Sequence, residues 1–230
     1  MKTVGILGGM GPEATVLLMQ KIIAAVPARD DADHIPLIVD QNSQVPSRIA
    51  RLIEGSGPDP APVLAAMAAR LQQAGAQALA MPCNTAHHYA GTIRAAVDIP
   101  FLDMVAASAR AARAAVGQGG RVGLLASPAV AKIGLFDAAL AAQGVHVLHP
   151  DDGAALLGAI RSIKAHGPDD AARGALLAAS GALLTKGAEV QLIACTEFSL
   201  IPEAVATGVR AIDTLDVLVE EIVGFARAAP

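Results

Sequence analysis

Aromatic side chains are scarce in this chain of 230 residues, which has no Trp, one Tyr and four Phe. Proteins that hold single-stranded nucleic acids stack the bases on aromatic rings, so this composition argues against such a platform. An excess of basic residues is also missing, because 17 Lys and Arg face 21 Asp and Glu and the formal net charge is −4. Without a basic patch, we expect no nucleic-acid partner.

Long hydrophobic runs are missing as well, although 53% of the residues are hydrophobic. Gly, Pro or a charged residue interrupts each apolar stretch before the roughly 20 residues that a membrane-spanning helix needs. The first apolar run, residues 4–7, is too short for a signal peptide. We therefore expect a cytoplasmic protein without a membrane partner, whose aliphatic side chains build one large or two small domains.

Only two cysteines are present, Cys83 and Cys195. In a chain without a secretion signal, reduced thiols are expected rather than a disulfide. Each cysteine follows a short apolar run typical of a buried strand, and Thr85 or Thr196 follows it as a helix start would. A helix start lowers the pKa of a thiol, so we expect a thiolate that suits a general base. Two thiols in equivalent settings favour an acid/base pair over a lone nucleophile.

Other functions of the cysteines remain open at this point. A free cysteine is most often a small buried hydrophobe. A zinc site built from Cys83, His87, His88 and Cys195 is disfavoured, because the chain has no CxxC pair and no cluster of ligands near Cys195. A cysteine hydrolase assisted by His and Asp would use one thiol and leave the second unexplained.

Short apolar runs alternate with longer helical patterns along the chain, which predicts an α/β fold with parallel sheets covered on both faces. The expected strands are 4–7, 35–39, 78–81, 99–102, 122–125, 145–148, 190–194 and 209–212. The expected helices are 12–26, 63–74, 85–97, 104–116, 129–143, 153–165, 169–186, 202–206 and 215–226.

The second half of this pattern repeats the first. The strands expected at 4–7 and 122–125 are 118 residues apart (122 − 4), and the two cysteines are 112 apart (195 − 83). Asp103 and Asp213, which end two further apolar runs, are 110 apart (213 − 103). This order predicts two similar domains related by duplication. Because ligands bind beyond the carboxyl ends of parallel strands, facing domains would bring both thiols to one cleft.

A glycine-rich segment, GGMGPEAT at residues 8–15, follows the first expected strand and opens a helix. It fits a loose dinucleotide fingerprint, but Pro12 removes one N–H donor and the acid after the next strand, Asp40, is more distant than in that motif. Two interpretations remain, a structural turn and a loop whose N–H groups bind a carboxylate.

Two cations also have alternative interpretations. Arg48 lies just beyond the second expected strand, where a guanidinium can hold a carboxylate in a two-pronged hydrogen bond. Lys164 ends a helical pattern, where a lysine ordinarily compensates the helix dipole. From the pattern alone, both are more often surface residues.

The combined motifs resemble the aspartate/glutamate racemase superfamily, and most closely its aspartate racemase branch. The resemblance rests on GGMGPxAT at residues 8–15, PCNTAH at 82–87 and CTE at 195–197, in order and at strand ends. A fourth segment, NSQVPSR at 42–48, is similar to the substrate-binding stretch of aspartate racemases, and Lys164 resembles a later lysine that is also tied to substrate binding.

The resemblance implies a racemase that needs no pyridoxal phosphate or other cofactor, with Cys83 and Cys195 as acid and base. It implies two similar α/β domains, residues 1–98 plus 208–230 and residues 99–207, with the active site between them, and a homodimer. Arg48 and Lys164 would bind or balance carboxylates of an amino-acid substrate. The other residues that it assigns to the substrate are Met10, Gly11, Gln44, Asn84, Thr85, Thr196 and Glu197.

Two positions of the chain are informative about the substrate. Ser47 replaces the usual Asp beside Arg48, which leaves strict aspartate specificity open. Glu197 stands where glutamate racemases usually have His, which points away from that branch. Related cysteine-dependent enzymes, namely hydantoin racemases, maleate isomerases and arylmalonate decarboxylases, and a non-catalytic binding protein for acidic amino acids stay as alternatives.

Overall fold

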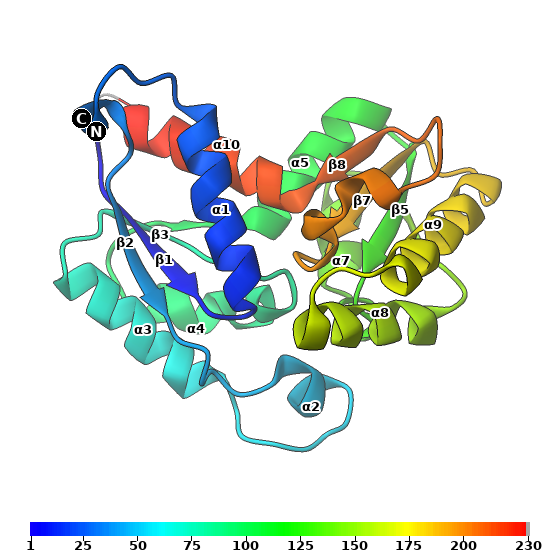
Figure 1. The fold of residues 1–230 in the computed structure, drawn as a ribbon, viewed down its shortest axis with the longest axis horizontal. Helices are drawn as coiled ribbons and strands as arrows, with labels where there is room; N and C mark the ends of the chain where they lie inside the picture. The colour runs from blue at the N-terminus through cyan, green and yellow to red at the C-terminus, as the bar shows by residue number, and fades with distance from the viewer. Residues whose placement is uncertain (229–230) are drawn as a thin grey trace. The chain divides into compact units, whose positions relative to one another are not determined.

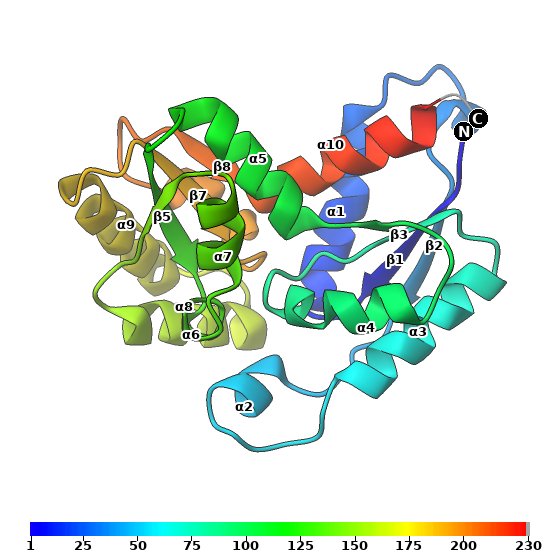
Figure 2. The same ribbon diagram turned by 180° about the vertical axis from the view of Figure 1, so that it is seen from behind.

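The computed structural model describes residues 1–228, which Figures 1 and 2 draw from opposite sides. The chain forms two compact units. Unit 1 is Met1–Met104 together with the chain from Leu215 onward, and unit 2 is Val105–Thr214. The chain therefore leaves unit 1 after Met104 and leaves unit 2 after Thr214. The domain boundaries at residues 98 and 207 stay a prediction.

Unit 1 is a four-stranded parallel sheet in the order β2-β1-β3-β4. Its strands are β1 (Val4–Gly8), β2 (Leu37–Gln41), β3 (Ala78–Ala80) and β4 (Phe101–Leu102). Helices α1 (Pro12–Ala25) and α10 (Thr214–Arg227) cover one face, and α3 (Ala61–Gln73) and α4 (Ala90–Ala95) cover the other (Figure 1).

Unit 2 repeats this topology, with a parallel sheet in the order β6-β5-β7-β8. Its strands are β5 (Arg121–Ala126), β6 (His146–Leu148), β7 (Val190–Ala194) and β8 (Ala211–Asp213). Helices α5 (Met104–Val116) and α7 (Leu135–Ala142) cover one face, and α8 (Gly153–His166) and α9 (Asp170–Thr185) cover the other. The predicted fold class, two similar parallel α/β units, is confirmed.

The first strand of each sheet shows why these sequences form central strands. All five residues of β1 are buried, because helices cover both faces of the sheet. Successive side chains alternate between the faces: Ile6 packs in the core beneath α1 and α10, and Leu7 in the core beneath α3 and α4. In β5, Leu124 and Leu125 divide in the same way between the two cores of unit 2.

Several local expectations were wrong, and the first has a clear backbone cause. The helix expected at 129–143 is split into α6 (Pro128–Lys132) and α7, because Gly134 adopts a left-handed conformation with φ 63° that ends the first helix. The helix expected at 85–97 begins as a 3₁₀ helix, Thr85–Tyr89, before α4. A short helix that the sequence did not predict, α2 (Arg48–Leu52), follows β2. Further 3₁₀ helices are Asp31–Asp33, Phe198–Leu200 and Pro202–Ala204.

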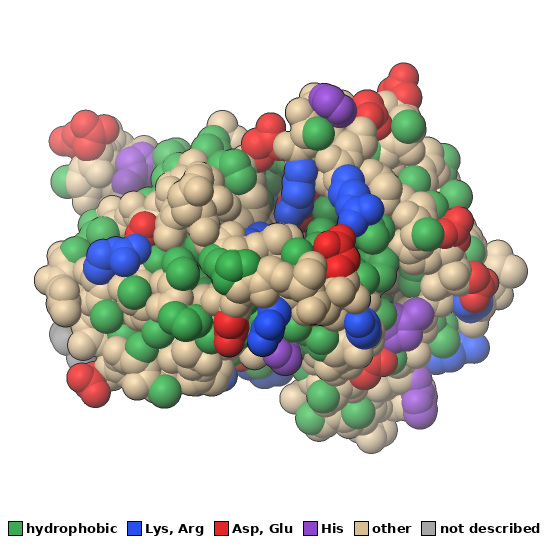
Figure 3. All heavy atoms as spheres, turned by 90° about the horizontal axis from the view of Figure 1, so that it is seen from below, with side chains coloured by type: hydrophobic (Ala, Val, Ile, Leu, Met, Phe, Trp, Pro, Cys, Tyr) green, Lys and Arg blue, Asp and Glu red, His purple; other side chains and the backbone are tan. Residues whose placement is uncertain are grey.

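The surface agrees with the charge composition. On the face drawn in Figure 3, Lys and Arg side chains are interspersed with Asp and Glu, and no continuous basic patch covers that face. Among residues 1–228, no helix combines the length and hydropathy that crossing a bilayer requires.

Candidate active site

Cys83 lies just beyond the carboxyl end of β3, the third strand of the first unit in chain order. Its N–H donates a hydrogen bond to the Met81 carbonyl (2.9 Å), which makes a tight turn after the strand. The side chain is 7% exposed and packs in the core beneath α3 and α4. Asn84, which is buried, then begins the 3₁₀ helix that starts at Thr85.

Cys195 directly follows β7, which holds the same place in the second sheet as β3 in the first. It is also 7% exposed and packs in the core beneath α8 and α9, the counterpart of the core that holds Cys83. The Phe198 N–H donates to the Cys195 carbonyl (2.9 Å), and a 3₁₀ helix of three residues begins there. The two cysteines therefore occupy equivalent positions in duplicated units.

The expectation of a lowered thiol pKa is wrong for Cys195. Burial raises the pKa of this thiol well above its usual range, and the neighbouring Glu197 carboxylate raises it further. The thiol donates a hydrogen bond to Glu197 Oε2 (3.0 Å). The chain after Cys195 forms a single 3₁₀ turn rather than an α-helix, so the stabilisation of a thiolate by a long helix is missing. Cys195 therefore favours the protonated thiol form.

Lys164, Glu197 and Cys195 form a connected set of polar side chains, which we call the charged relay. From the last turn of α8 the Lys164 Nζ approaches Glu197 Oε1 at 3.0 Å, while the other oxygen of that carboxylate holds the thiol. Glu197 is nearly buried, whereas the lysine side chain is 37% exposed. The ammonium opposes the carboxylate and lowers the Cys195 pKa. Lys164 thus does more than compensate the dipole of its own helix.

This relay predicts opposite effects of removing its two charges. Glu197→Gln should lower the Cys195 pKa, since it removes a negative charge beside the thiol, whereas Lys164→Met should raise it. The pH dependence of Cys195 alkylation by iodoacetamide, followed on the Cys195 peptide by mass spectrometry, measures both shifts. Lys186→Met is the matched control, because Lys186 pairs with Asp151 instead. Shifts in the same direction in the two relay variants would contradict this arrangement.

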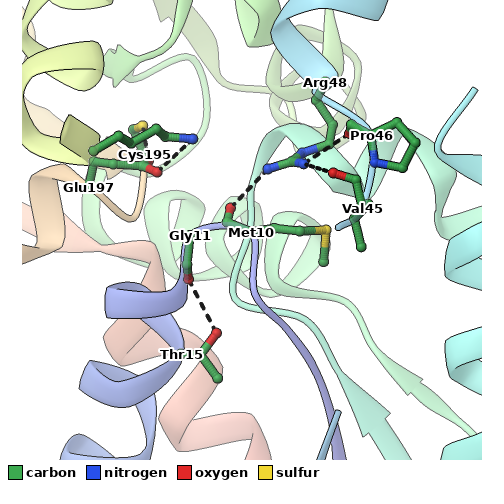
Figure 4. Close-up of polar contacts among 9 residues, drawn as sticks. Met10, Gly11, Thr15, Val45, Pro46, Arg48, Cys195 and Glu197 are labelled. Carbon is green, nitrogen blue, oxygen red and sulfur yellow. Dashed lines mark hydrogen bonds and ion pairs between the residues drawn. The ribbon is translucent and has the colours of Figure 1, made fainter. Parts of the chain in front are cut away.

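Arg48, the first residue of α2, is held by the backbone of unit 1. Figure 4 shows its guanidinium directed at carbonyl oxygens, and the bonds run to Val45 (3.3 Å), Pro46 (3.0 Å) and Met10 (3.3 Å). These acceptors are neutral, so they orient the guanidinium without neutralising its charge. The arrangement suits a fixed cation that receives a carboxylate.

The glycine-rich turn between β1 and α1 has a structural explanation. Thr15 Oγ1 accepts a hydrogen bond from the Gly9 N–H (3.0 Å). It also bonds to the Gly11 carbonyl (3.2 Å), as Figure 4 shows, and the two bonds close the turn. Gly9 has φ 90°, and a Cβ there would lie 2.4 Å from the Asn42 backbone. The close approach to the loop after β2 therefore requires glycine, and the turn brings the Met10 carbonyl to Arg48.

Ser47 acts as the N-cap of α2. Its Oγ accepts a hydrogen bond from the Ala50 N–H (3.2 Å), the bond that an N-terminal cap supplies. Ser and Asp are both strong N-caps, so the departure at this position keeps the local structure that orients Arg48. Gln44, by contrast, is exposed, and its N–H donates to Asn42 Oδ1 (3.0 Å) within the preceding turn.

The cap predicts a local effect on α2. Ser47→Ala should speed hydrogen exchange of the Ala50 amide about fivefold, since losing an N-cap costs about 1 kcal/mol, and Ser47→Asp should leave the rate near that of the wild type. Exchange measured by NMR tests this. Equal exchange in the Ala and Asp variants would show that the cap contributes nothing.

Arg48 and Lys164 lie on helices that hold the same place in the chain order of the two units, Arg48 at the start of its helix and Lys164 in the last turn. The helix α2 lies between β2 and α3, and α8 lies between β6 and α9. The two cations are 116 residues apart (164 − 48), within the spacing of 110 to 118 that relates the repeats. This correspondence was not predicted from the sequence, although the spacing was a signal for it.

The structure groups the predicted site residues within each unit. In unit 1, Met10 contacts Arg48, while Asn84 and Thr85 follow Cys83. In unit 2, Lys164, Glu197 and Cys195 are connected, and the buried Thr196 lies between the last two in the chain. Across residues 1–228, no group of three or more His, Cys, Asp or Glu side chains is arranged to hold a metal ion.

Comparison with known proteins places this arrangement in a family. The model of the Asp/Glu/Hydantoin racemase family matches residues 7–222. The aspartate racemase of Picrophilus torridus has 25% sequence identity, and its structure superposes with a TM-score of 0.84 over 98% of this chain and 94% of that one. An aspartate racemase homologue from Pyrococcus horikoshii OT3 has 22% identity and a TM-score of 0.77, covering 99% of this chain and 100% of that one.

A sequence relative has a narrower match. The broad specificity amino-acid racemase RacX of Bacillus subtilis (strain 168) is 32% identical over 106 residues, 44% of this chain and 45% of that protein, so the match spans less than half the length of either. The family model, in contrast, extends over both units and includes both cysteines. Together with the shared fold, this match shows that the chain belongs to the Asp/Glu/Hydantoin racemase family.

Proposed function

We propose that this protein racemises an acidic amino acid, with Cys83 and Cys195 as the paired acid and base. The observation that carries the proposal is the equivalence of the cysteines, which follow the same strand of two duplicated sheets. Racemisation needs the same chemistry on two opposite faces of one carbon atom. A duplicated scaffold with one thiol in each half suits that requirement.

The proposed reaction transfers one proton at each face. A thiolate of one cysteine takes the α-proton, and the C–H electron pair is left as an anion spread over the α-carbon and its carboxylate. The thiol of the other cysteine gives its proton to the opposite face of that carbon. The first cysteine ends as a thiol and the second as a thiolate, so no oxidant, reductant or cofactor enters the balance.

The charges around Cys195 bear on its protonation state. Because burial and Glu197 raise its pKa, we propose that Cys195 carries its proton before a substrate binds. Once Cys195 has given its proton away, its thiolate lies beside the Glu197 carboxylate, and the Lys164 ammonium compensates the added charge.

Two cations support the proposed substrate class. An acidic amino acid carries two carboxylates, and Arg48 and Lys164 supply one cation from each unit. In the proposal, the polar side chains of Asn84, Thr85 and Thr196 and nearby N–H groups hold the α-carboxylate and stabilise the charge that develops on it.

We propose aspartate as the preferred substrate, and the specificity is proposed to extend to other amino acids. The name of the Picrophilus relative supports aspartate, and the name of the Bacillus relative supports broad specificity. We also propose a homodimer, and an arrangement of residues 1–98 plus 208–230 and of residues 99–207 as the two domains that enclose the substrate. These features rest on the resemblance to aspartate racemases.

A panel of single enantiomers tests the proposed function. Purified protein, without added pyridoxal phosphate, should convert L-aspartate and D-aspartate to the racemate, followed by chiral chromatography. The Cys83→Ala/Cys195→Ala double variant, purified in the same way, controls for contaminating racemases. Racemisation of a substituted hydantoin but of no acidic amino acid would overturn the substrate class, and equal rates in the double variant would overturn the role of the cysteines.

A further inference from the structure

The fourth residue after each cysteine is a buried polar side chain. His87 follows Cys83 and is 3% exposed, and Ser199 follows Cys195 and is 2% exposed. Neither is among the residues assigned to the substrate. Burying a polar group costs free energy because the group loses its contacts with water, and hydrogen bonds within the protein offset that cost. The partners in those bonds therefore indicate what the group does.

His87 connects the Cys83 turn to the end of unit 1. Its Nδ1 lies 2.8 Å from the Cys83 carbonyl oxygen, and the Met104 N–H donates to Nε2 (3.2 Å). An amide N–H can only donate, so Nε2 must be the unprotonated nitrogen. The single ring proton is therefore on Nδ1 and is donated to the Cys83 carbonyl.

The surroundings keep this imidazole neutral. Burial lowers the His87 pKa, which outweighs the opposing effect of its bond to Cys83, while Asp103 raises the pKa and Arg94 lowers it. The ring also packs against Phe101 of β4, with centroids 5.3 Å apart. A neutral ring with one donor and one acceptor is the form that can bridge a carbonyl and an N–H.

Ser199 makes the corresponding connection in unit 2. Its hydroxyl donates to Oδ1 of the buried Asp213 (2.7 Å), the last residue of β8. The next residue, Thr214, donates from Oγ1 to the Ile193 carbonyl (2.9 Å), two residues before Cys195. The turn after Cys195 is thus fixed to the end of the neighbouring strand.

Both connections reach the point where the chain leaves its unit. Met104 is the last residue of unit 1 before Val105, and Thr214 is the last of unit 2 before Leu215. Met104 is also the first residue of α5 and Thr214 the first of α10, so each unit boundary lies at the start of a helix.

We propose that His87 and Ser199 are matched positioning residues, each of which ties the turn carrying its cysteine to the segment where the chain leaves that unit. The hydrogen bonds of His87 run to the Cys83 carbonyl and the Met104 N–H, and that of Ser199 runs to Asp213, so each is proposed to act through the turn rather than on the sulfur. The consequence for catalysis rests on the proposed racemase function, whereas the consequence for the cysteine turn does not.

Accessibility of each thiol tests the positioning directly. His87→Ala should speed iodoacetamide alkylation of Cys83 roughly tenfold and leave Cys195 unchanged, because losing a buried hydrogen bond favours local opening of one turn. Ser199→Ala should do the reverse. Peptide mapping by mass spectrometry gives both rates in one sample. His88→Ala is the matched control, since His88 is the exposed neighbour on the same 3₁₀ helix.

Conservative variants remove the two hydrogen bonds of His87 one at a time and disturb the packing less than alanine does. His87→Asn places a donor where Nδ1 stands and so keeps the Cys83 bond, and His87→Gln places an acceptor near Nε2 for Met104. Both should alkylate at rates between wild type and His87→Ala. Ser199→Thr keeps the hydroxyl and should restore the wild-type rate at Cys195.

These experiments distinguish a failure of the proposed positioning roles from a failure of the proposed racemase function. If each variant changes the alkylation rate of one cysteine only, but the wild-type protein racemises nothing, the positioning roles of His87 and Ser199 stand and the proposed function is rejected. With an active enzyme, His87→Ala should reduce kcat more than it raises KM and should slow the exchange that depends on Cys83. Equal acceleration of both cysteines, or a rate for Cys83 in His87→Ala no higher than in His88→Ala, would overturn the proposal.

Discussion

Replacing either Cys83 or Cys195 with alanine is expected to lower the rate of racemisation by about 10²–10⁴-fold, the contribution of one positioned general acid or base. Each variant should keep exchange of the α-proton with solvent for one enantiomer only, because the remaining thiol still reaches one face of the carbon. The two variants should therefore show opposite preferences. Chiral chromatography measures racemisation, and proton NMR in heavy water measures exchange.

Controls for this result are available within the chain. Both cysteines are 7% exposed and pack in equivalent cores, so the two alanine variants remove similar volumes, and thermal unfolding reports the structural effect of each. The double variant should lose both exchange and racemisation. Wild-type racemisation in either single variant would reject the paired mechanism, and exchange of the same enantiomer in both would reject the assignment of one cysteine to each face.

Removing the Arg48 guanidinium should have the second largest effect. Arg48→Met is expected to lower kcat/KM for aspartate by roughly 30-fold to 1000-fold, since losing the partner of a buried carboxylate costs about 2–4 kcal/mol. The loss should be smaller for alanine, which has no side-chain carboxylate. Steady-state kinetics with both amino acids provide the comparison.

Two further variants show whether charge or geometry is responsible. Arg51→Met is the matched control, because Arg51 is exposed on the same short helix, and its kcat/KM should stay near that of the wild type. Arg48→Lys keeps the charge but cannot make the planar set of bonds to the carbonyls of Met10, Val45 and Pro46, so intermediate activity is expected. An unchanged kcat/KM for aspartate in Arg48→Met would remove Arg48 from the substrate site.

The fold could be predicted from the sequence because its signals are local. Buried parallel strands appear as short apolar runs between helical patterns, as in β1 and β7, and a duplication leaves a constant spacing. The equivalence of Cys83 and Cys195 followed from that spacing. The break at Gly134 was missed, because a glycine inside a helical pattern is common and only its positive φ shows the interruption.

The electrostatics of the site could not be predicted in the same way. The direction of the Cys195 pKa depends on burial and on a carboxylate two residues away whose second oxygen is held by Lys164, from a separate helix. The role of Ser47 likewise depends on α2, a helix of five residues that is too short to give a periodic pattern. The first effect needs burial and the distant Lys164, whereas the second is local but leaves no periodic signal in the sequence.

The measurement that tests the central claim most directly is the early time course of label from heavy water. Wild-type protein is given L-aspartate in heavy water, and at low conversion both the D-aspartate formed and the L-aspartate recovered are analysed for α-deuterium. Two cysteines acting on opposite faces predict deuterium in the product and almost none in the recovered substrate, because the group that supplies the new proton is not the group that removed the old one. Equal labelling of product and recovered substrate from the start would show a single base, and would contradict the account.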